Sequence, residues 1–138
     1  MLKTAGAVCA VSALPANSKW FAPIAAAAKA DIFIVRTTVT SARHISKSYR
    51  GLIFSELIKS AAMPFTVGNC VSYSACLELI QTGISVVMVG VEPGTACITR
   101  EVLGVGVPQI TATIDCPAAR DQYQKESGRY VPIITDGS

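Results

Sequence analysis

Short β-branched apolar runs alternate along this chain with segments of helical character, and this alternation constrains the fold more than any other feature. Residues 32–35 and 85–89 are two such runs, bounded by charged residues or glycine. Continuous apolar runs are typical of strands that are covered on both faces. Strands that alternate with helices favour right-handed βα units in a parallel sheet. The sequence therefore predicts the α/β class.

The order of apolar and polar segments along the chain predicts five strands with helices between them. The strands are expected at residues 6–14, 31–36, 65–69, 85–89 and 131–135. Helices are expected from a cap at Asn17 or Ser18 to residue 30, and over 51–62 and 72–81. The stretch 37–49 is polar and basic and suggests a loop or broken helix, and residues 100–103 suggest a helical turn.

Residues 110–126 carry two conflicting patterns. Residues 111–114 alternate like a strand, whereas the following alanines and long polar side chains favour a helix from about Asp115 to Gly128. The helix is the preferred interpretation. Five strands do not close an eight-stranded barrel, and we expect an open sheet with two exposed edges that belongs to something larger.

Composition excludes several classes of protein. Hydrophobic residues make up 51% and charged residues 15%, which excludes a disordered chain. A net charge of +3 without a Lys/Arg cluster does not favour nucleic-acid binding. No apolar stretch approaches the ~20 residues of a membrane helix, and the apolar N-terminal run is too short for a convincing signal peptide. We expect neither a nucleic-acid nor a membrane partner.

The cysteines indicate a reducing compartment. They are odd in number and lie on apolar segments: Cys9, Cys70, Cys76, Cys97 and Cys116. Without a Cys-x-x-Cys pair, and with His44 as the one histidine, a zinc site is not favoured. His44 itself is expected at the surface. Unpaired thiols favour the cytoplasm.

The loop at residues 90–100 combines features of a functional site. It follows the apolar run 85–89 and carries Pro93, Gly94, Cys97 and Thr99. Cys97 is a candidate nucleophile that Thr99 could assist with a proton. The alternative is that Cys97 is a small buried apolar residue, as many free cysteines are.

Three ordered motifs resemble the IMP dehydrogenase/GMP reductase family. They are GTACITREV at residues 94–102, GVPQITA at 106–112 and VPIITDG at 131–137. The segment 67–69 (VGN) follows the same order, and residues 43–50 resemble the IMP dehydrogenase-related subgroup. The resemblance covers nearly the whole chain. It implies that residues 1–138 are part of a catalytic (β/α)8 (TIM) barrel domain, with about five of its eight strands.

In this family a cysteine attacks C2 of the purine ring. The resemblance implies that Cys97 is this nucleophile and that Thr99 handles a proton or activates water. Backbone carbonyls of Gly94 and Cys97 would hold the potassium ion of the dehydrogenases. NAD would take a hydride, and hydrolysis of the covalent thioimidate would convert IMP to XMP. The alternatives are a GMP reductase-type enzyme that uses NADPH, and a non-catalytic remnant that only binds nucleotide.

The resemblance also implies the substrate-binding residues. Thr95 and Gly137 would contact the nucleotide phosphate, and Asp136 would bind the ribose hydroxyls. Asn69 would line the cofactor side. From the residues alone, a plain turn is the preferred interpretation of Asp136-Gly137, and Asn69 could equally be a cap or turn residue.

Three positions depart from the family pattern: Arg36, Glu92 and Ser138. Arg36 ends a predicted strand where the dehydrogenases usually carry the aspartate that binds the NAD ribose, and a cation there suits a phosphate such as that of NADPH. The family also implies a homotetramer. Because the chain lacks several barrel strands and the flap, we expect little turnover by it alone.

Overall fold

The structure is a computed structural model that describes residues 6–37, 39–40, 42–44, 52–91, 104 and 106–136. Its centre is a five-stranded parallel sheet with the strand order β1-β2-β5-β6-β7. The strands are β1 (Ala10–Ala13), β2 (Ile32–Arg36), β5 (Phe65–Cys70), β6 (Val86–Val89) and β7 (Ile133–Thr135). The prediction of an α/β protein with a parallel sheet is confirmed.

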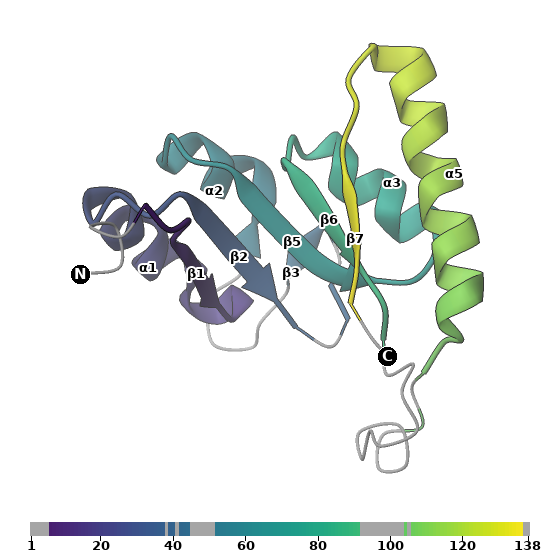
Figure 1. Cartoon of the computed structure of the whole chain (residues 1–138), viewed down its shortest axis with the longest axis horizontal. Coiled ribbons are helices and arrows are strands. Elements are labelled where there is room, and N and C mark those ends of the chain that lie inside the picture. Colours follow the sequence, from purple (N-terminus) through teal and green to yellow (C-terminus); the bar gives the residue numbers. More distant parts are fainter. Residues whose placement is uncertain are drawn as a thin grey trace.

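The strands cross the sheet in chain order without a reversal (Figure 1). A doubly wound sheet reverses its strand order and carries helices on both faces, whereas a (β/α)8 barrel continues in one direction. Helices α2 (Phe54–Ser60) and α3 (Tyr73–Gln81) lie behind β5 and β6 in Figure 1. This unidirectional order is that of an incomplete (β/α)8 barrel, as the sequence led us to expect.

Helices connect the consecutive strands of the sheet. Helix α1 (Pro15–Ala27) joins β1 to β2, α3 joins β5 to β6, and α5 (Gln109–Ser127) precedes β7. The predicted cap of α3 is confirmed, because the Ser72 hydroxyl accepts a hydrogen bond from the Ala75 amide at 3.3 Å. No helix in the described part of the chain is long and apolar enough to cross a membrane.

The core lies around the central strand β5, all of whose residues are buried. Phe65 of β5 packs against Phe33 of β2, with ring centroids 5.7 Å apart, and Val67 and Val87 extend the same core. The outer strands β1 and β7 are much more exposed. The sheet therefore has a well-packed centre and two open edges.

Helix α1 begins earlier than predicted. It starts at Pro15, so the prediction of a cap at Asn17 or Ser18 is wrong. Proline suits the first turn because the amide it lacks would have no helical partner there. Ser18 lies buried within the helix, and its hydroxyl donates to the Leu14 carbonyl at 2.9 Å.

Helix α5 also begins earlier, at Gln109 rather than near Asp115. The strand-like alternation of residues 111–114 was misleading, because these residues are helical. The Thr113 hydroxyl donates to the Gln109 carbonyl at 2.9 Å, which satisfies its polar group inside the helix. Ala112, Cys116 and Ala119 are buried on one face, so packing against the protein decided the conformation. The predicted end at Gly128 is confirmed.

The segment before α2 contains a small antiparallel pair that the sequence did not predict. Strand β4 (Leu52–Ile53) pairs with β3 (Arg43–His44), with Arg43 opposite Ile53. The helix predicted from residue 51 therefore starts only at Phe54. The predicted surface position of the His44 side chain and the predicted turn at 100–103 lie outside what the structure describes.

Candidate active site

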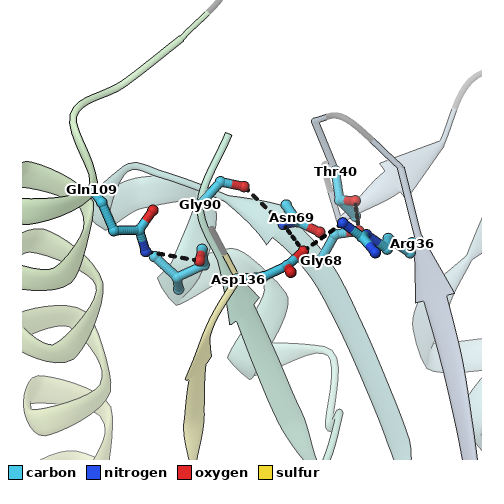
Figure 2. Close-up of polar contacts among 8 residues, drawn as sticks. Arg36, Thr40, Gly68, Asn69, Gly90, Gln109 and Asp136 are labelled. Carbon is cyan, nitrogen blue, oxygen red and sulfur yellow. Dashed lines mark hydrogen bonds and ion pairs between the residues drawn. The ribbon is translucent and has the colours of Figure 1, made fainter. Parts of the chain in front are cut away.

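Polar side chains meet where the parallel strands end. Arg36 ends β2, Asn69 lies near the end of β5, Gly90 follows β6, and Asp136 follows β7. Because parallel strands present their carboxyl ends at one edge, residues far apart in sequence converge there. Figure 2 shows these residues pointing toward one another. This edge is where (β/α)8 enzymes carry their active sites.

Two described side chains hold the Asp136 carboxylate through the same oxygen atom. Its Oδ2 accepts a hydrogen bond from Asn69 Nδ2 at 2.8 Å and lies 2.7 Å from an Arg36 guanidinium nitrogen. Its own amide donates to the Val89 carbonyl at 2.8 Å, which continues the pairing of β7 with β6. No donor within the described ranges bonds to Oδ1. The carboxylate is therefore oriented through Oδ2, and among the described residues no donor occupies Oδ1.

Asn69 connects two strand ends. Its Nδ2 donates to the Gly90 carbonyl at 2.8 Å as well as to Asp136, and its side chain is buried (Figure 2). Its Oδ1 is buried and has no partner among the residues the structure describes. Buried polar atoms are normally hydrogen-bonded. Asn69 lies in a strand and caps no helix, so the alternative role as a helix cap is wrong.

The segment after β2 is fixed to the same strand end. The Thr37 amide donates to the Gly68 carbonyl at 3.0 Å, and the Asn69 amide donates to the Thr37 carbonyl at 3.0 Å. The Thr40 hydroxyl donates to Gly68, and the Thr40 amide donates to the Asn69 carbonyl at 2.8 Å. The peptide bond between Gly68 and Asn69 is cis. The hydrogen bonds of Thr37 and Thr40 hold the backbone at Gly68 and Asn69 in place.

Gly90 permits a close approach that no other residue would allow. A Cβ atom there would lie 2.2 Å from the Asp136 carbonyl oxygen and 2.8 Å from Gln109 Oε1, and φ is +135°. Gln109 Nε2 donates to the Val89 carbonyl at 3.2 Å, while its Oε1 is buried and unpartnered among the described residues. Gln109 was not predicted as a site residue, although its place in the 106–112 motif was a signal.

Arg36 approaches Asp136 from the solvent side. Its side chain is 56% exposed, whereas that of Asp136 is 27% exposed. The pair is therefore only partly shielded from water, and its contribution to stability is small. In this arrangement the cation lies next to the expected nucleotide site, where it can interact with Asp136 or with an anionic ligand.

The segment that carries Cys97 begins and ends at this edge of the sheet. Val91 and Val107 form an antiparallel bridge, and the Val107 amide donates to the Val91 carbonyl at 3.1 Å. Gly94, Thr95, Cys97, Thr99, Gly137 and the two departures Glu92 and Ser138 lie outside the described residues. Of the predicted site residues, the structure thus brings together Asn69 and Asp136.

Comparison with known proteins decides the family. A model of the IMP dehydrogenase / GMP reductase domain matches residues 3–138. The chain belongs to the IMP dehydrogenase/GMP reductase family. The resemblance inferred from the motifs is confirmed. Members of this family are oxidoreductases.

Relatives of known sequence support the same assignment. An uncharacterized oxidoreductase of Mycobacterium tuberculosis is 33% identical over 138 residues, which is 99% of this chain and 37% of that protein. The inosine-5'-monophosphate dehydrogenase of Halalkalibacterium halodurans is 47% identical over 70 residues, or 51% of this chain and 13% of the relative. The chain therefore spans little more than a third of the length of the first relative, and its match covers a still smaller share of the second.

A solved structure extends the likeness to the fold. The IMP dehydrogenase/GMP reductase-like protein of Corynebacterium glutamicum superposes with a TM-score of 0.85 at 34% identity. The match covers 98% of this chain and 34% of that protein. The fold described above is therefore that of one part of a longer family member.

Proposed function

We propose that this chain contributes a purine-nucleotide site of the IMP dehydrogenase type, in which Asp136 binds the ribose hydroxyls. The supporting observation is the one-sided support of the carboxylate. Asn69 and Arg36 both contact Oδ2, while no described residue donates to Oδ1. A carboxylate accepts hydroxyl hydrogen bonds strongly, and one that is already oriented loses little entropy on binding.

The cofactor side is the second part of the proposal. The buried Oδ1 of Asn69 has no donor among the described residues. An amide N–H donor, such as the carboxamide of a nicotinamide ring, would satisfy it. The polar atoms at this strand end therefore fit NAD. When bound, NAD supplies the acceptor for a hydride.

The reaction we propose is the oxidation of IMP to XMP. The Cys97 thiolate would add to C2 of the purine, hydride would leave C2 for the cofactor, and a thioimidate would remain. Water, activated with help from Thr99, would then hydrolyse the carbon–sulfur bond and restore the thiol. The overall balance is IMP, NAD⁺ and water to XMP, NADH and a proton. Thr95 and Gly137 would hold the phosphate.

A GMP reductase-type reaction is the second candidate, and Arg36 is the observation that favours it. The cation stands at the end of β2 and is more than half exposed, which suits the additional phosphate of NADPH. In that reaction Cys97 would displace ammonia from C2 of GMP, and hydride delivered to C2 by the cofactor would then let the carbon–sulfur bond break, releasing the Cys97 thiolate and IMP. The same Asp136 would bind the ribose in both reactions.

Several further expectations belong to the whole family member. Carbonyls of Gly94 and Cys97 would hold potassium, the assembly would be a homotetramer, and the location would be the cytoplasm. Because the chain spans only part of the length of its relatives, we expect little or no turnover by these 138 residues alone. Rapid NADH formation from IMP by the purified chain would contradict that expectation.

Protection of Cys97 from alkylation tests the site without requiring turnover. We would treat the chain with a mild alkylating agent, with and without IMP or GMP, and follow modification of Cys97 and Cys9 by mass spectrometry. IMP should slow modification of Cys97 and leave Cys9 unchanged. The arms with GMP, NAD and NADPH separate the two candidate reactions.

A pair of carboxylate variants provides the control. Asp136→Ala should abolish the protection, whereas Glu78→Ala, at an exposed position of α3, should retain it. Equal protection in both variants would refute the role of Asp136. Failure of every nucleotide to protect Cys97 in the unmodified chain would refute an assembled nucleotide site.

A further inference from the structure

Three cysteines from three different elements meet in the interior, next to the strand end that carries Asn69. Cys70 ends β5, Cys76 lies in α3 and Cys116 lies in α5. Their sulfur atoms all lie within 4.8 Å of one another, and the three residues are at most 1% exposed. We refer to Cys70, Cys76 and Cys116 as the thiol cluster. The proposed nucleotide reaction uses none of these three thiols.

The thiol cluster is held by secondary structure on three sides. Cys76 Sγ donates to the Cys116 carbonyl at 3.5 Å, and Cys116 Sγ donates to the Ser72 carbonyl at 3.8 Å. The Cys70 carbonyl accepts a hydrogen bond from the Gly90 amide at 3.1 Å. The sulfurs are therefore positioned by a strand and two packed helices, and a ligand would find them already assembled.

The spacing matches thiolate coordination of a metal ion. Zinc–sulfur bonds of ~2.3 Å place coordinating sulfurs about 3.8 to 4.0 Å apart in tetrahedral or trigonal geometry. Sulfurs that are already within 4.8 Å reach this separation with side-chain movements of less than ~1 Å. Thiolates select soft ions such as Zn²⁺ and Cu⁺ over Mg²⁺ or Ca²⁺. The group found among the described residues contains no carboxylate or imidazole.

The electrostatics of the cluster also suit a cation. Three buried thiolates would repel one another without an ion between them, and with Zn²⁺ they leave a net charge of −1. Arg120, one turn beyond Cys116 on α5, is mostly buried and close enough to act on Cys76 electrostatically.

We propose that Cys70, Cys76 and Cys116 form a buried site for one soft d¹⁰ metal ion, Zn²⁺ or Cu⁺. Each coordinating thiol releases its proton to solvent, so the ion replaces the protons of the cluster. The bound ion would join β5 to α3 and α5. Because Cys70 directly follows Asn69 and bonds to Gly90, the ion would also stabilise the strand end that carries the nucleotide site.

Cobalt provides a spectroscopic probe that does not depend on enzymatic activity. We would titrate the reduced 138-residue chain with Co²⁺ and follow sulfur-to-cobalt charge-transfer absorption, then displace Co²⁺ with Zn²⁺. A separate anaerobic titration with Cu⁺ against a copper(I) chelator distinguishes the two ions. We expect one equivalent per chain, with charge-transfer intensity corresponding to three thiolates.

Single serine variants identify the ligands. Cys70→Ser, Cys76→Ser and Cys116→Ser should each weaken uptake at least tenfold, whereas Cys9→Ser, at a half-buried free thiol, should bind as the unmodified chain does. If a serine variant fails to fold, the unmodified chain and Cys9→Ser still test the site. Their metal stoichiometry and charge-transfer intensity show whether three thiolates bind one ion. Failure of Co²⁺, Zn²⁺ and Cu⁺ to bind, or uptake that persists unchanged in a folded Cys116→Ser variant, would overturn the proposal.

Discussion

Replacement of Gly90 by alanine tests how closely the strand ends must approach. The added Cβ would lie 2.2 Å from the Asp136 carbonyl oxygen, which is closer than real contacts allow, and φ at Gly90 is +135°. Two costs therefore add. A non-glycine backbone in such a region costs about 1–3 kcal/mol, and overpacking of a well-packed interior costs about another 1–3 kcal/mol. We expect Gly90→Ala to reduce the free energy of unfolding by about 2–6 kcal/mol.

Two other glycines separate these costs. Gly83 has φ +96° and no atom within 4 Å of its hypothetical Cβ, so Gly83→Ala carries the backbone cost alone. Gly68 has no positive φ, but its Cβ would lie 2.4 Å from the Met88 Cβ, so Gly68→Ala carries the packing cost. Urea denaturation followed by circular dichroism gives the three free energies of unfolding. A further readout is nucleotide protection of Cys97, which should be lost in Gly90→Ala and retained in Gly83→Ala.

The difference in the free energy of unfolding between Gly90→Ala and Gly83→Ala measures the packing cost at Gly90. If the two variants differ by less than ~0.5 kcal/mol, the approach of Gly90 to Asp136 carries no packing cost. Retention of full nucleotide protection in Gly90→Ala would also refute the idea that this approach positions Asp136. Either result would mean that the strand end adapts more readily than the structure indicates.

Three further substitutions probe the site and its support. Asn69→Ala removes one buried and one partly buried hydrogen bond and should lower the free energy of unfolding by about 2 kcal/mol in urea denaturation. An unchanged midpoint would show that these hydrogen bonds contribute nothing to stability. Arg36→Met should change the free energy of unfolding by less than ~1 kcal/mol, because the ion pair with Asp136 is partly exposed. The same variant should weaken NADPH binding more than NAD binding in a fluorescence titration. Equal weakening of both cofactors would show that Arg36 does not select between them. Ser72→Ala removes the cap of α3 and should cost about 1 kcal/mol by the same denaturation assay, whereas Ser74→Ala, at an exposed position within the helix, should be nearly neutral.

The local patterns predicted the strands better than they predicted the helix ends. Strand β2 and strand β6 are continuous apolar runs, and a buried strand requires only that local property. The start of α5 at Gln109 was missed because β-branched residues favour strands locally, while burial of Ala112 and Cys116 against the protein favours the helix. The hairpin of β3 and β4 was missed because its pairing joins segments that no local pattern links.

The sequence by itself determined the family and the βα repeat, because motifs and hydrophobic periodicity are properties of contiguous residues. Asn69 and Asp136 could be named as site residues in this way, 67 positions apart. Only the tertiary structure decided that Asp136 contacts both Asn69 and Arg36 at one strand edge, that Gly90 must lack a side chain, and that three of the cysteines meet. Spacing along the chain disfavoured a metal site, whereas parallel pairing and the packing of α3 on α5 bring Cys70, Cys76 and Cys116 within 4.8 Å. The physical reason is that register and helix packing are set by long-range burial, which brings together groups whose sequence separation carries no signal.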